Sequence, residues 1–150
     1  IYPKIIIDNS NNNEEDKFTP LVNQISNIKI VQDAMFSSTN EIRGTSYRSR
    51  INDPKYQFAG KTGTAQVKKI TARDRELDLE TSEIPYEERD HALYIAYGPY
   101  KNPRYAVSIL VEHGGSGSSV AAPLAKKLFK KIIDRHEIRK NFESNKYLNI

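Results

Sequence analysis

The chain contains no cysteine among its 150 residues. Disulfides and thiolate metal sites are therefore excluded, and the absence fits a reducing or an oxidising compartment equally well. No apolar tract reaches the eighteen residues that suggest a membrane-spanning helix, so we expect a soluble segment without a membrane crossing. No internal repeat is visible, and the length fits one domain with one core.

The net charge of +4 is modestly basic, which permits an acidic partner such as nucleic acid. The densest basic stretch is residues 126–131. Apolar residues recur around it at helical spacing, namely Leu124, Leu128 and Ile132, and Phe129 and Ile133. This pattern favours the solvated face of an amphipathic helix, so we expect no nucleic-acid partner. A basic nucleic-acid-binding module remains the alternative from another functional class.

Helical periodicity predicts two helices. The first runs from about Ile25 to Phe36, with Ser26 or Asn27 as its cap, and the short polar residues 37–40 are expected to fray its end before Gly44. The second spans roughly residues 119–139, with Pro123 tolerated only in its first turn.

Three strands are predicted between these helices. The first covers residues 56–67, and its glycines allow a close approach of other groups. Residues 91–97 and 105–111 are apolar on both faces, as in central strands covered on both sides. Glycine and proline between them predict an antiparallel hairpin. The order of elements predicts an α+β fold, an antiparallel sheet with helices packed on it.

Two stretches are too polar to contribute much to a core. We predict a polar loop at residues 9–16 and a long charged loop at residues 68–90. Acids and arginines alternate in the second loop, so a pair of general-acid carboxylates is not indicated.

The motif Lys61-Thr62-Gly63-Thr64 carries the clearest chemistry. A cation and hydroxyls beside a glycine backbone suit an acyl substrate that bears a carboxylate and lies along the strand edge. The next backbone N–H can point at a developing oxyanion. Lys-Thr-Gly is one of the signature motifs of penicillin-binding proteins and related β-lactamases, although the bare triplet also occurs by chance.

Further stretches give this motif its context: FAGKTGTAQV at 58–67, RDHAL at 89–93, NPRYAV at 102–107, and EHGGSG at 112–117 followed by AAP at 121–123. In this order and spacing they resemble the class B penicillin-binding proteins of the elongation type, the penicillin-binding protein 2 group. Residues 44–46 match the family's Gly-Thr-Ala step more weakly. The resemblance covers about residues 28–135.

The resemblance implies that residues 1–150 are a C-terminal fragment of a transpeptidase domain with the penicillin-binding and β-lactamase-like fold. Its parent would be a D,D-transpeptidase that cross-links peptidoglycan stem peptides through a serine acyl-enzyme and binds β-lactams. By the same resemblance Lys61 and Thr64 are catalytic, Lys61 poising the serine-lysine network and the Thr64 N–H forming half of the oxyanion hole. Thr62, Gly63 and Thr64 bind substrate. No cofactor or metal is implied.

The resemblance also implies a parent in the bacterial inner membrane with its catalytic domain in the periplasm. The expected partners are stem peptides, β-lactams and the cell-wall elongation machinery. The chain starts at Ile1 rather than at methionine, which is typical of an excised fragment or a processed product.

Two local sets imitate the missing catalytic motifs, Ser26 with Lys29 and Ser38 with Asn40. We interpret both serines as cap or turn residues at helix ends, because the family's nucleophile lies much farther upstream of the lysine motif. The fragment therefore lacks two of three catalytic motifs and is expected to be inactive alone.

Other candidate sites are weaker. A serine β-lactamase or β-lactam sensor is the alternative within the same fold, but it would need a hydrolytic carboxylate on a loop that the chain lacks. Residues 114–117 lack the Gly-Lys-Ser/Thr ending of a phosphate-binding loop and are expected to form a turn. His91, His113 and His136 lack metal-ligand spacing, and the first two are expected at strand ends.

Overall fold

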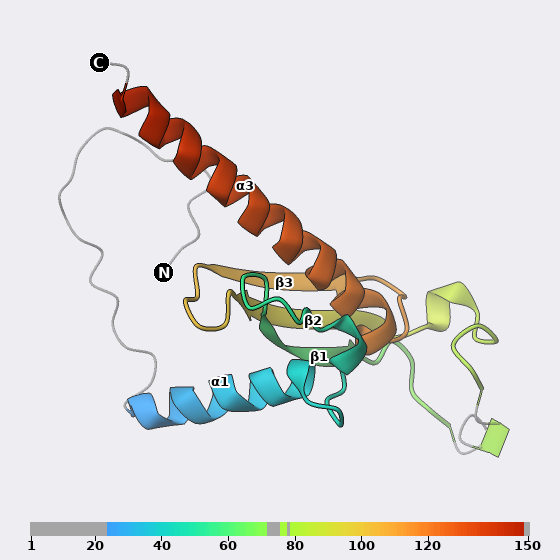
Figure 1. Ribbon diagram of the computed structural model, residues 1–150. Helices are drawn as coiled ribbons and strands as arrows, with labels where there is room; N and C mark the ends of the chain where they lie inside the picture. The colour runs from blue at the N-terminus through green and yellow to red at the C-terminus, as the bar shows by residue number, and fades with distance from the viewer. Residues whose placement is uncertain (1–23, 72–75, 78, 149–150) are drawn as a thin grey trace, which may run out of the picture.

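The computed structural model describes residues 24–71, 76–77 and 79–148 (Figure 1), so the predicted polar loop at 9–16 lies outside the described residues. The elements in chain order are α1 Ile25–Asn40, a 3₁₀ turn Tyr47–Ser49, β1 Ala59–Ala65, a 3₁₀ turn Tyr86–Glu88, β2 His91–Gly98, β3 Tyr105–Val111, a π-helical turn Gly117–Ala121 and α3 Ala122–Leu148.

The three strands form one antiparallel sheet in the order β1-β2-β3. Gly60 lies opposite Ala96 and Thr64 opposite Ala92, which sets the register of β1 on β2. Helix α1 lies along β1, and α3 runs across the sheet and continues beyond it (Figure 1). The predicted hairpin and the α+β fold class are confirmed.

The core lies between the sheet and α3. Ala125, Phe129 and Ile133 of α3 are fully buried, and the ring of Phe129 stacks on that of Phe58 with centroids 5.0 Å apart. Phe58 in turn meets the ring of Tyr94 edge-on at 6.4 Å. Lys127, Lys130 and Lys131 remain exposed on the opposite side of α3, which confirms the predicted solvated face. Leu124 and Leu128 are partly exposed and do not belong to the buried stripe.

The prediction that both hairpin strands are covered on both faces is wrong. Strand β3 lies at the edge of the sheet, and its alternate residues are exposed, including Ser108 and Leu110, the latter to 56%. On β2, Ile95 is 52% exposed beside the fully buried Tyr94. An apolar residue on each face of a strand shows which residues can be buried, but it does not show whether the chain supplies a covering layer for both faces.

Three predictions about helix ends are also wrong. Helix α1 begins at Ile25 with Gln24 at its cap position, and no side chain caps it, so neither Ser26 nor Asn27 has that role. Residues 37–40 do not fray but form the last turn of α1. Helix α3 reaches Leu148 rather than residue 139, and the chain enters it through the π-helical turn, with Pro123 in the first turn as predicted.

A buried cluster of hydroxyl groups joins α1 to the sheet. The Tyr94 hydroxyl lies 2.9 Å from Thr39 Oγ1 and 3.0 Å from Ser46 Oγ. Burial raises the pKa of Tyr94, and its hydrogen bonds with Ser46 and Thr39 oppose that shift. The Tyr94 ring passes directly beneath Gly60, where a Cβ would lie 2.5 Å from the ring. The cluster therefore fixes the end of α1 against both β1 and β2.

Replacing Tyr94 with phenylalanine should lower the free energy of unfolding by about 1–3 kcal/mol, because Thr39 and Ser46 would each lose a partner for a buried hydroxyl. Urea unfolding of the variant measures the change. Tyr97→Phe is the matched control, since the half-buried Tyr97 hydroxyl makes only a 3.4 Å contact with the Gln32 carbonyl. A Tyr94→Phe variant no less stable than Tyr97→Phe would contradict the role of the cluster.

Candidate active site

The free edge of β1 presents the backbone of the Lys-Thr-Gly motif. Thr39 of α1 accepts a hydrogen bond from the Gly60 N–H at 3.0 Å, and its hydroxyl lies 3.2 Å from the Gly60 carbonyl oxygen. Both polar groups of Gly60 therefore point away from β2. Because backbone groups alternate sides along a strand, the N–H groups of Thr62 and Thr64 point to the same free edge. Those of Lys61 and Gly63 point toward β2.

The Lys61 side chain folds onto this edge. Its ammonium donates to the Thr62 carbonyl oxygen at 2.7 Å and to Thr62 Oγ1 at 3.3 Å. Lys61 and Thr64 are exposed, and Thr62 is half-buried. A cation, two hydroxyls and two outward N–H groups thus occupy a short stretch of one strand, a set of donors suited to an anionic or acyl ligand.

Another part of the chain also approaches β1 closely at Gly63. The π-helical turn packs against the strand pair so tightly that a Cβ on Gly117 would lie 2.6 Å from the carbonyl oxygens of both Gly63 and Leu93. The turn expected at residues 114–117 lies earlier, at residues 112–113, and residues 114–116 form an irregular link to the π-helical turn, in which the Gly115 N–H donates to the Asp90 carbonyl and Gly115 has a positive φ of 77°. Glycines therefore allow α3 to start directly beside the motif.

The segment after α1 adds residues that the sequence did not identify as part of the site. A Cβ on Gly44 would lie 2.3 Å from the Ser38 carbonyl oxygen, so a glycine is required for the chain to turn back against the helix end. Thr45 consequently lies between Ser38 and Thr62, with its Oγ1 at 3.1 Å and 3.2 Å from their hydroxyl oxygens. The match of residues 44–46 to the family's Gly-Thr-Ala step was the available signal.

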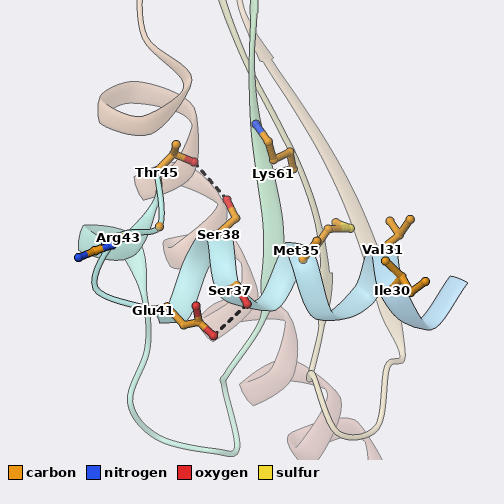
Figure 2. Close-up of a pocket in the computed structure, with 11 residues that line it drawn as sticks. Ile30, Val31, Met35, Ser37, Ser38, Glu41, Arg43, Thr45 and Lys61 are labelled. Atoms are coloured by element: carbon orange, nitrogen blue, oxygen red, sulfur yellow. Dashed lines mark hydrogen bonds between the residues drawn. The ribbon is translucent and has the colours of Figure 1, made fainter. Parts of the chain in front are cut away.

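A groove of about 540 Å³ lies beside Lys61, between α1 and the segment that follows it. Figure 2 shows Lys61 on β1 next to Ser38 and Thr45, with Met35 and Val31 farther along α1. The groove is lined by Ile30, Val31, Ala34, Met35, Ser37, Ser38, Glu41, Arg43, Gly44, Thr45 and Lys61. The motif lysine therefore borders a concave surface that is largely apolar.

The two sets that imitate catalytic motifs have other contacts. Lys29 forms an ion pair with Asp33 at 3.8 Å, and Ser26 is exposed in the first turn of α1. Asn40 Nδ2 donates to the Phe58 carbonyl at 2.9 Å and to the Phe36 carbonyl at 3.1 Å, which ties the helix end to the start of β1. The Asn40 amide therefore holds the end of α1 against β1, which supports a structural interpretation of Asn40.

The histidines lie away from the motif lysine. His91 and His113 stand at the ends of β2 and β3 as predicted, where His91 Nδ1 accepts a hydrogen bond from the His113 N–H at 2.9 Å. His136 Nδ1 lies 2.6 Å from the Tyr105 hydroxyl. Within the part of the chain that the structure describes, no group of three or more possible ligands is placed to hold a metal. The described part of residues 68–90 contains turns, two helical residues at 76–77 and the 3₁₀ turn Tyr86–Glu88, and it contains no strand.

Comparison with known proteins decides the family. Residues 1–130 match the family described as Penicillin binding protein transpeptidase domain. The chain belongs to this family. The predicted resemblance to the penicillin-binding protein 2 group is confirmed by relatives named peptidoglycan D,D-transpeptidase MrdA. The Haemophilus influenzae protein is 40% identical over 94 residues, and the Salmonella typhimurium protein is 35% identical over 105 residues.

These matches cover 63% and 70% of this chain but only 14% and 16% of the two relatives, so the chain spans about a sixth of their length. Solved structures of PBP2 proteins also match the fold of this chain. The penicillin-binding protein PBP2 of Helicobacter pylori, in complex with MreC, gives a TM-score of 0.58 at 33% identity, over 73% of this chain and 17% of that one. Pseudomonas aeruginosa PBP2 in complex with WCK 5153 gives 0.56 at 32% identity, over 75% and 21%.

The isolated 150-residue chain should form no covalent adduct with a penicillin. Neither Ser26 nor Ser38 is hydrogen-bonded to a lysine that could take its proton, and Lys29 is engaged with Asp33. Intact-mass spectrometry after long incubation tests this expectation. An adduct mapped to Ser26 would show that Ser26 and Lys29 are a working pair and that the assignment of the motifs is wrong.

Proposed function

We propose that this chain forms the substrate-binding edge of a peptidoglycan D,D-transpeptidase of the penicillin-binding protein 2 type. The whole protein would cross-link stem peptides through a serine acyl-enzyme and would be acylated by β-lactams. The observation that carries this proposal is the free edge of β1, where Lys61, Thr62 and Thr64 direct donors away from β2. The names of the MrdA relatives support the same activity.

In this proposal, an acyl substrate or a β-lactam lies along the edge of β1 beyond Gly60. The Thr64 N–H, one of the outward groups, donates to the oxyanion that develops on the attacked carbonyl. The Thr62 and Thr64 hydroxyls bind the ligand carboxylate, and Gly63 leaves the backbone accessible. Lys61 adds positive charge beside Thr62 and holds the nucleophile network poised, a role that rests on the family resemblance.

The nucleophilic serine and its activating lysine are expected outside these 150 residues, so residues 1–150 are proposed as the C-terminal part of the transpeptidase domain, inactive alone. The proposal places the whole protein in the bacterial inner membrane with this domain in the periplasm. Within the described residues, no helix has the length and apolar character needed to cross a membrane. A partner from the elongation machinery is proposed because the Helicobacter pylori relative was solved with MreC.

In the full-length protein, Lys61→Ala should slow acylation by a fluorescent penicillin at least ~100-fold, the scale of losing one preorganised electrostatic contributor. Thr64→Ala should have a smaller effect, because it removes a hydroxyl and keeps the main-chain N–H. Stopped-flow or gel-based acylation rates measure both changes.

Lys29→Ala is the matched control, since this lysine lies on the exposed side of α1 and pairs with Asp33. Its acylation rate should equal that of the unaltered protein. A normal rate for Lys61→Ala, or a loss with Lys29→Ala as large as with Lys61→Ala, would refute the proposed site.

A further inference from the structure

A continuous line of hydroxyl groups leads from α1 to the motif lysine. Ser38 Oγ lies 3.1 Å from Thr45 Oγ1, Thr45 Oγ1 lies 3.2 Å from Thr62 Oγ1, and the Lys61 ammonium lies 3.3 Å from the same Thr62 oxygen. The four residues come from the last turn of α1, the segment after it and β1, and three of them can be followed in Figure 2. The line therefore ends on the proposed carboxylate-binding hydroxyl.

The hydrogen-bonding capacity of Thr62 is limited, and at 3.2 Å either hydroxyl of the Thr45–Thr62 pair could be the donor. A hydroxyl has one proton to donate and two lone pairs that accept, whereas a lysine ammonium only donates. Lys61 therefore occupies one lone pair of Thr62 Oγ1. If Thr45 donates to the second lone pair, the only proton of Thr62 is left for a ligand, and Thr45 in turn accepts from Ser38. Hydrogen bonds aligned in this way polarise one another.

We propose that Thr45 is a positioning residue that turns the Thr62 hydroxyl outward, as a donor to the ligand carboxylate. This inference rests on the proposed function, because it assigns to Thr62 the carboxylate of a stem peptide or β-lactam. Thr45 acts through Thr62, with Ser38 holding Thr45 in the donating orientation.

The backbone around Thr45 is built to place this side chain. Only a glycine at position 44 fits against the Ser38 carbonyl, as the 2.3 Å approach of a Cβ shows. The following residue, Ser46, donates its N–H to the same carbonyl at 3.0 Å and buries its hydroxyl against Tyr94. Thr45 is thus held on both sides by backbone contacts to α1, although its own side chain is exposed toward the edge of β1.

The test compares two probes on the full-length protein, a fluorescent penicillin with its free carboxylate and the methyl ester of the same compound. Thr45→Val keeps the shape of the side chain but removes the hydroxyl. It should lower the acylation rate constant for the free acid about fivefold, the scale of one neutral hydrogen bond, and that for the ester less than twofold. Thr45→Ser should restore the rate with the acid.

A double-variant cycle tests whether Thr45 acts through Thr62. Thr45→Val should cost nothing further in a Thr62→Val background, because the hydroxyl that it orients is already absent. Ser38→Ala should lower the rate with the acid by about twofold, since it removes one donor to Thr45. Ser108→Ala, an exposed hydroxyl on β3, is the control and should change neither rate. Thermal unfolding of each variant excludes misfolding as the cause.

Equal losses for acid and ester, additive effects of Thr45→Val and Thr62→Val, or no loss with Thr45→Val would each overturn this inference. The proposed function fails separately, through a normal acylation rate for Lys61→Ala. Loss of acylation in Lys61→Ala with an unaffected Thr45→Val would therefore refute the positioning role alone.

Discussion

The pairing of Thr39 with Gly60 is the contact on which the site depends. It joins residues 21 positions apart and occupies both the N–H and the carbonyl of Gly60 with one hydroxyl. The contact stops α1 against the edge of β1 and turns Gly60 away from β2. The outward direction of Thr62 and Thr64 then follows from the alternation of the strand.

Three glycines near this contact allow other groups to pack closely against the backbone. The Tyr94 ring packs against Gly60, the end of α1 against Gly44, and the β1–β2 pair against Gly117, each at a distance that a Cβ would prevent. A large side chain could fill none of these places, so packing at the site relies on small residues and buried hydroxyls rather than on the aromatic core around Phe58. Every buried side-chain polar atom in the described part of the chain has a hydrogen-bond partner, as such an arrangement requires.

The sequence predicted the elements and the motif strand well because periodicity, turn residues and glycine placement are local properties. Residues 37–40 show where this approach failed. Short polar side chains at a helix end favour fraying when considered alone, but Thr39 and Asn40 find partners on β1, which folds against them only in the tertiary structure. The exposure of β3 escaped prediction for a related reason, since a strand's own residues do not show what covers it. Thr45 was visible only as part of a weak match, because its partners are distant in the chain.

The alternation along β1 has a consequence for changes in chain length. Gly60 and Thr64 lie four positions apart, an even spacing, so the backbone groups of both face the same edge. Substitutions within this stretch leave that relation intact, whereas inserting or deleting one residue reverses it and turns the N–H at the Thr64 position toward β2. With Thr39 anchoring one end, the strand could absorb such a change only through a bulge that restores the count. The number of positions from Gly60, which Thr39 holds, to Thr64 must therefore stay even, whichever side chains occupy the stretch between them.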